Sequence, residues 1–107
     1  MKRIHVTNEE GILTGWFDSE KAVSYSENTT WNGSNHISKA TGSQTEHECL
    51  YVTKGKKFIL NSWSQWQGTT ETYIEIGKQE AAEWLVRNDY QDIPSILEAE
   101  VAQLEMA

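Results

Sequence analysis

Residues 46–66 read EHECLYVTKGKKFILNSWSQW, and this stretch decides the fold. Two runs that favour β-structure, 46–53 and 57–66, flank the short basic loop Lys54-Gly55-Lys56. Runs of this kind joined by a glycine-containing loop are typical of a β-hairpin. The stretch therefore predicts two adjacent antiparallel strands, and the remaining strands and helices are placed around them.

Other short runs predict further strands around this hairpin. Residues 2–7 alternate apolar and polar side chains, and 12–17 form a second short run with glycines at its bends. Residues 70–76 alternate in the same way. The Asn32-Gly33 pair readily adopts the positive φ angles of a hairpin turn, and 36–40 could be a strand leaving that turn.

Three segments predict helices. In residues 19 to about 26, Asp18 or Ser19 can accept the first free backbone N–H groups, and Glu20 lies in the first turn. A second helix follows Gly77, ends near Asn88 and has an apolar stripe of Ala81, Ala82, Leu85 and Val86. A third is opened by Asp92 and Pro94, and its apolar residues recur at helical spacing: Ile93, Leu97, Val101 and Leu104.

The order of these segments predicts one α+β domain over residues 1–107. We expect an antiparallel β-sheet of about five strands with one short N-terminal helix and two C-terminal helices. A chain of 107 residues can bury one modest core. No repeat, linker or low-complexity tract divides the chain.

The charge balance argues against binding a nucleic-acid backbone. The chain has 16 acidic and 9 basic residues and a formal net charge of −7, which repels phosphate over most of the surface. Seven of the acids lie between Glu80 and Glu105. Most such charge is a solvated face, and the alternative is a protein partner with a basic surface.

Cys49 is the only cysteine, so an intramolecular disulfide is impossible. The first eleven residues contain no apolar core of a signal peptide, and no apolar run approaches 18 residues. A cytoplasmic location without membrane contact is the expectation.

A segment rich in tryptophan and small polar residues, 31–68, holds the candidate binding residues. Exposed tryptophan beside amide and hydroxyl groups is typical of binding surfaces, because a rigid apolar plane is combined with adaptable hydrogen bonding. Burial of the indoles in the core is the alternative. The candidates are Trp31, Asn35, His36, Ser43, Gln44, Trp63, Gln65 and Trp66.

Residues able to perform chemistry are present, but their spacing matches no known site. His36, His47 and Cys49 could serve a small hydrolase or a metal-dependent enzyme, with Glu46 nearby. However, Cys and His at i and i+2 rarely converge on one substrate atom, and Lys39 precedes Gly42 where a phosphate-binding loop needs lysine after its second glycine. We therefore assign no catalytic residue, metal ligand or cofactor.

Several strings together resemble a family of small uncharacterised bacterial and mobile-element proteins. The resemblance covers about residues 15–88 and is carried mainly by HISKATGSQ (36–44) and SWSQWQG (62–68), with shorter matches at 15–18, 31–33, 47–48 and 50–51. It implies a stand-alone single-domain protein and transfers no activity.

The leading functional hypothesis is a non-enzymatic protein-binding module. By analogy with other small acidic chains, it would be an inhibitor, antitoxin or immunity-type protein that acts through a Trp/Ser/Gln/Asn surface. Two alternatives remain: the small enzyme described above, and a small-ligand module in which an exposed indole stacks on a sugar or a base.

Overall fold

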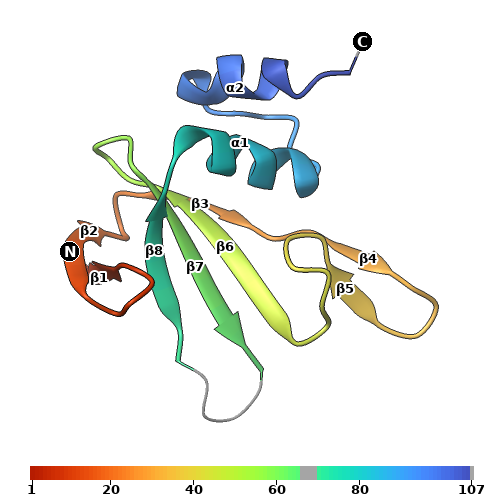
Figure 1. Cartoon of the computed structure of the whole chain (residues 1–107), viewed down its shortest axis with the longest axis horizontal. Coiled ribbons are helices and arrows are strands. Elements are labelled where there is room, and N and C mark those ends of the chain that lie inside the picture. The colour runs from red at the N-terminus through yellow and green to blue at the C-terminus, as the bar shows by residue number, and fades with distance from the viewer. Residues whose placement is uncertain (66–69, 107) are drawn as a thin grey trace.

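The computed structural model describes residues 1–65 and 70–106 and shows an α+β fold built on antiparallel pairing. Its central sheet has four strands in the order β3-β6-β7-β8 (Figure 1). Their bounds are Val23–Ser26 for β3, Glu46–Val52 for β6, Phe58–Ser64 for β7 and Thr72–Ile76 for β8. The predicted hairpin of 46–53 and 57–66 is thus confirmed as β6 and β7 up to Ser64.

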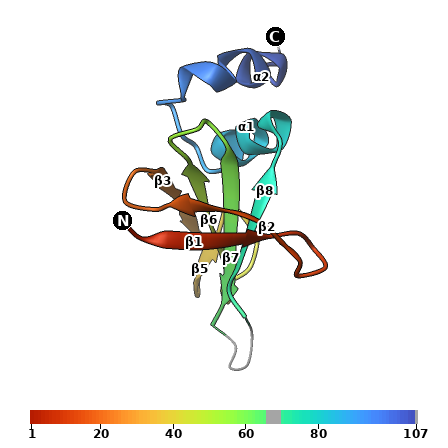
Figure 2. The same ribbon diagram turned by 90° about the vertical axis from the view of Figure 1, so that its left-hand side faces the viewer.

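Two small antiparallel sheets flank the central one. Strands β1 (Arg3–Thr7) and β2 (Leu13–Asp18) form a hairpin that crosses the front of the sheet in Figure 2. Strands β4 (Thr29–Trp31) and β5 (His36–Ser38) form an arm that extends beyond β3 and β6 (Figure 1). We call this second pair the β4–β5 arm.

Alternation along β6 and β7 divides the core into two clusters, because successive side chains on a strand point to opposite faces. Leu50, Val52 and Phe58 point toward α1 (Lys78–Arg87) and pack with its buried side chains Ala81, Trp84 and Leu85. On the other face Ile59 packs with Val6 and Phe17 of the β1–β2 hairpin. The sheet is therefore the middle layer between α1 and that hairpin.

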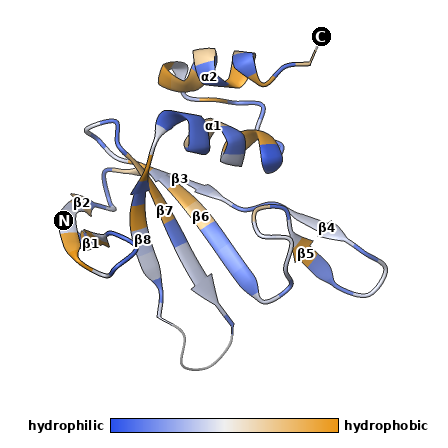
Figure 3. Ribbon diagram, viewed as in Figure 1, coloured by the Kyte–Doolittle hydropathy of each residue, from blue (hydrophilic) through white to orange (hydrophobic). Residues whose placement is uncertain are grey.

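The helical layer covers only one end of the sheet. A 3₁₀ turn, η1 (Ser95–Leu97), and helix α2 (Glu98–Gln103) follow α1, and α2 stacks on its outer side (Figure 1). In Figure 3 the hydrophobic colours of β6 lie near α1, whereas its far end is hydrophilic. The far ends of β6 and β7 are thus left for polar side chains.

The predicted helix at 19 to about 26 is wrong. The Asp18 carboxylate does accept the N–H of Glu20, at 3.0 Å, but it does so within a turn closed by the Lys21 N–H and the Asp18 carbonyl. The same side-chain bond caps helices and stabilises turns. After the turn, residues 23–26 pair with β6 as strand β3.

The two C-terminal helices are confirmed, with one change in the first. Trp84 is buried in α1, whereas Val86, placed on the apolar stripe from the sequence, is exposed. The second helical segment starts after Pro94 with η1, and Leu97 is its fully buried residue.

The strand count is larger than the five or so expected from the sequence. Within residues 1–65 and 70–106 the chain forms eight strands in three sheets, because β3 and β4 were not predicted. None of the helices in these residues is long and apolar enough to cross a bilayer.

Candidate functional site

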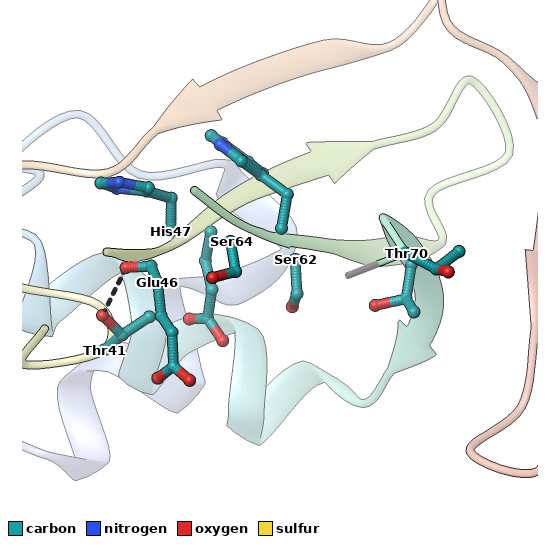
Figure 4. A pocket seen from close by; sticks show the side chains of 9 residues that line it. Thr41, Glu46, His47, Ser62, Ser64 and Thr70 are labelled. Carbon is teal, nitrogen blue, oxygen red and sulfur yellow. Dashed lines mark hydrogen bonds between the residues drawn. The ribbon is translucent and has the colours of Figure 1, made fainter. Parts of the chain in front are cut away.

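A polar pocket of about 230 Å³ lies at the far end of β6 and β7, beyond α1 (Figure 4). In Figure 4 Glu46, Ser62 and Ser64 point to one side of the two strands and His47 to the other. This arrangement follows from the strand period, since Glu46 pairs with Ser64 and Glu48 with Ser62 across the ladder. Carboxylates and hydroxyl groups therefore line the side that faces the helices.

Glu48 is the half-buried carboxylate of this pocket. The indole Nε1 of Trp84 donates a hydrogen bond of 3.0 Å to its Oε1 atom, which links α1 to β6. Burial raises the pKa of Glu48, against the smaller lowering effects of the Trp84 hydrogen bond and the Arg87 charge. Glu46 differs, because its side chain is exposed and its main-chain carbonyl accepts the Thr41 hydroxyl at 2.7 Å.

On the opposite face His47 is held by Glu27. The His47 Nδ1 atom lies 2.7 Å from Glu27 Oε2, and Glu27 Oε1 accepts the Glu48 N–H at 2.7 Å. This carboxylate fixes the imidazole ring, while the buried Nε2 atom finds no hydrogen-bond partner within the described part of the chain. Carboxylate–histidine pairs occur in catalytic and metal sites, where Nε2 faces the reacting group.

Trp63 lies beside this pair. Its ring centre is 5.8 Å from that of His47 with a tilt of 30°, and 37% of the residue is exposed. The register explains the contact, because His47 and Trp63 are directly opposite on β6 and β7. Of the two indoles at 63 and 66, Trp63 is thus partly open to solvent, and Trp66 lies outside the described residues.

The β4–β5 arm presents Trp31, Asn35 and His36. Trp31 is 59% exposed and meets His36 edge to face, with ring centres 5.1 Å apart. The Asn32 side chain accepts the N–H groups of Ser34 and Asn35, and Gly33 has a φ of +100°, which glycine adopts without strain. A turn is therefore present where the sequence predicts one, but of the Asn-Gly pair only Gly33 has a positive φ.

Ser43 and Gln44 lie in the loop between β5 and β6. The Ser43 hydroxyl oxygen accepts the N–H groups of Thr45 and Glu46, so this side chain serves the loop itself, whereas Gln44 is exposed. The Gln65 N–H donates to the Thr45 carbonyl at 2.8 Å and brings the end of β7 to this loop. The predicted residues thus form two groups, one on the arm and one around the end of β7.

The residues considered for an enzyme are less well placed. His36 belongs to the arm, and His47 and Cys49 share a face of β6. Cys49 is buried, and burial raises the pKa of its thiol, which opposes formation of a nucleophilic thiolate. Among residues 1–65 and 70–106 no three His, Cys, Asp or Glu side chains gather closely enough to hold a metal ion.

Sequence reasoning missed two residues that the structure makes prominent. Glu27 meets His47 across twenty positions, and no local pattern signals such a contact. Trp16 is 54% exposed on β2, whereas its neighbour Phe17 is buried. The alternation of a strand could have indicated this difference, because adjacent aromatic residues on a strand must point to opposite faces.

Comparisons with protein-family models, curated proteins and solved structures found no match. The resemblance of 15–88 to small bacterial and mobile-element proteins stays a prediction.

Proposed function

We propose that the chain is a protein-binding module whose β4–β5 arm carries the main contact residue, Trp31. The observation that carries this proposal is the 59% exposure of Trp31 on an arm that lies outside both core clusters. A large indole left in water gives up the free energy that its burial would provide. A partner that covers the ring would recover it, and tryptophan is among the residues most enriched in binding hot spots.

The neighbours of Trp31 suit such a contact. His36, directly opposite on β5, contacts the ring edge to face, and this contact lowers the cost of ordering the indole when a partner docks. Asn35 and the exposed backbone of the Asn-Gly turn offer hydrogen-bonding groups at the tip. Trp63, Gln65 and Gln44 would form a second and smaller part of the surface.

The charge of the chain favours a basic partner. A net charge of −7 speeds association with a positive surface and slows it with a negative one. The proposed class is therefore that of small acidic inhibitors, antitoxins or immunity-type proteins, whose partners present basic grooves.

Affinity purification from the source cells, followed by calorimetry with the recovered partner, tests the proposal. We expect the Trp31→Ala variant to lose at least about 2 kcal/mol of binding free energy, which is the usual threshold for a hot spot. Binding should also weaken as salt is added, because charge attraction contributes to it.

The Trp16→Ala variant is the matched control. Trp16 is almost as exposed as Trp31, but it lies on the β1–β2 hairpin. Equal losses from both variants would indicate a general effect of removing an indole, and no loss from Trp31→Ala would remove the basis of the proposal. Circular dichroism of both variants checks that they fold.

A further inference from the structure

Most of the basic side chains of this acidic chain gather at one corner. Lys54, Lys56 and Lys57 lie in the β6–β7 turn, and Lys54 and Lys57 share a hollow of about 380 Å³ with Lys21 and Trp16. Arg3 reaches the same corner, since its guanidinium carbon lies 4.8 Å from the centre of the Trp16 ring. Lys2 follows the chain into this corner, because its main-chain N–H donates to Asp18 of the same hollow. These residues are six of the nine basic residues of the chain.

Three carboxylates lie at this corner, and one of them, Asp18, lines the hollow beside Lys21. The Asp18 carboxylate accepts the N–H groups of Lys2 and Glu20, which lowers its pKa and keeps it in the turn. Glu20 pairs with the terminal amine at 2.9 Å, and Glu75 lies 3.8 Å from Lys57. The six basic side chains and the terminal amine outnumber these three carboxylates, so the corner keeps a positive field within a negative molecule.

Three hydrogen bonds hold the backbone of the turn that carries the lysines. The Thr53 N–H donates to the Lys57 carbonyl, the Lys56 N–H donates to the Thr53 carbonyl, and the Thr53 hydroxyl accepts the Lys57 N–H. These bonds close the turn and hold Lys56 at a φ of +63°. Lys54 and Lys57 thus project from a fixed frame, which reduces the cost of ordering them around a ligand.

The aromatic wall of the hollow is Trp16. Its ring is 54% exposed and is held from one side by Arg3. A second hollow of about 200 Å³ also borders Trp16, Phe17 and Lys57. A flat ring of a ligand can stack on an exposed indole, and lysines supply point charges that bind phosphate.

We propose that this corner binds a nucleoside di- or triphosphate, with the base stacked on Trp16 and the phosphates among Lys21, Lys54 and Lys57. The volume of the hollow falls in the range of small-molecule sites. A nucleic-acid strand fits less well, because a long polyanion would extend from the corner onto acidic surface. The ligand is therefore of mononucleotide size.

Calorimetry and tryptophan fluorescence with three probes test the assignment: ATP, inorganic tripolyphosphate and adenosine. We expect ATP to bind more tightly than either of the other two, because it alone uses both the ring and the charges. Trp16→Ala should weaken ATP binding about tenfold, which is about 1.4 kcal/mol, because it removes the stacking of the base on the indole. Tripolyphosphate has no base, so its binding should be unchanged. Trp16→Phe should restore part of the affinity.

Lysine variants test the contribution of charge to phosphate binding. Lys54→Ala combined with Lys57→Ala should weaken both ATP and tripolyphosphate and reduce the salt dependence of binding. Lys78→Ala removes one positive charge from the exposed start of α1 and should have little effect. Wild-type protein that fails to bind ATP, or that binds it with no loss in Trp16→Ala, would overturn the assignment.

Two further measurements separate this site from other interpretations. A single-stranded oligonucleotide that binds far more tightly than ATP at the same corner would replace the mononucleotide with nucleic acid and overturn the proposal. Trp31→Ala should leave ATP binding unchanged, because Trp31 belongs to the β4–β5 arm. Failure of the nucleotide site and failure of the protein-binding arm are thus distinguishable.

Discussion

At the scale of single residues, Glu48 couples the packing of α1 to pH. Burial raises the pKa of Glu48 above its ordinary value of 4.5. The folded protein therefore holds this proton more tightly than the unfolded chain does, and stability falls as pH rises from about the unfolded pKa through the raised one. At neutral pH the half-buried charge is a net cost, although Trp84 and Arg87 reduce it.

We therefore expect Glu48→Gln to gain stability relative to wild type as pH rises from 4 to 7. The amide oxygen of glutamine can still accept the Trp84 N–H, so the variant keeps this hydrogen bond while losing the buried charge. Urea denaturation at both pH values measures the difference. Glu46→Gln removes the same charge from an exposed position and controls for net charge; a difference for Glu48→Gln that does not vary with pH would contradict the argument.

At the scale of elements, the β4–β5 arm is anchored to the end of α1 by two asparagines. The fully buried Asn88 accepts the Asn28 N–H at 2.9 Å through its side chain, and its carbonyl accepts the Asn28 side-chain amide at 3.1 Å. Asn88 also donates to the Trp84 carbonyl. From the other side of the arm, the Lys39 N–H donates to the Asn28 carbonyl at 2.8 Å, and the Lys39 ammonium pairs with Asp89.

Asn88→Ala should destabilise the fold by about 2 kcal/mol, because it leaves the Asn28 N–H without its acceptor at a fully buried position. The Trp84 carbonyl keeps the main-chain N–H of residue 88 as a donor. Chemical denaturation measures this loss, and NMR relaxation of the Trp31 indole should show greater motion of the arm. Gln91→Ala, at an exposed position three residues later, is the control. An arm that keeps its wild-type order in Asn88→Ala would show that its position depends on other contacts.

The elements that could be predicted from the sequence are those with local signals. The β6–β7 hairpin was predicted from two runs that favour β-structure around a glycine-containing loop, and α1 from its helical periodicity; both are present. Strand β3 was mistaken for a helix because the Asp18 carboxylate accepts the N–H of Glu20, and this bond occurs both in helix caps and in turns. Pairing with β6 makes residues 23–26 a strand.

In the candidate site, too, only the features with local sequence signals could be predicted. The Asn-Gly turn could be placed from the sequence because it is local. The Glu27–His47 contact could not be predicted, and neither could the corner that joins Trp16 to the lysines, because each depends on how separate strands pack.

At the scale of the whole molecule, the two faces of the central sheet are covered unequally. The larger cluster joins α1 and Leu97 to Leu50, Val52 and Phe58. The β1–β2 hairpin rests on a smaller cluster, which joins Val6 and Phe17 to Ile59. Because local opening follows the amount of apolar contact, the hairpin should open at lower free energy than the sheet and α1.

Native-state hydrogen exchange of two core variants tests this order. Phe17→Ala, which removes the aromatic ring of the smaller cluster, should speed exchange in β1 and β2 while β7 and α1 stay protected. Leu85→Ala, in the larger cluster, should lower protection throughout and reduce the free energy of unfolding by about 3 kcal/mol. If Phe17→Ala instead lowers protection equally in β1, β2, β7 and α1, the molecule unfolds as one cooperative unit. The lysine corner would then be as stable as the core, because the hairpin that carries Trp16 would open only when the whole molecule unfolds.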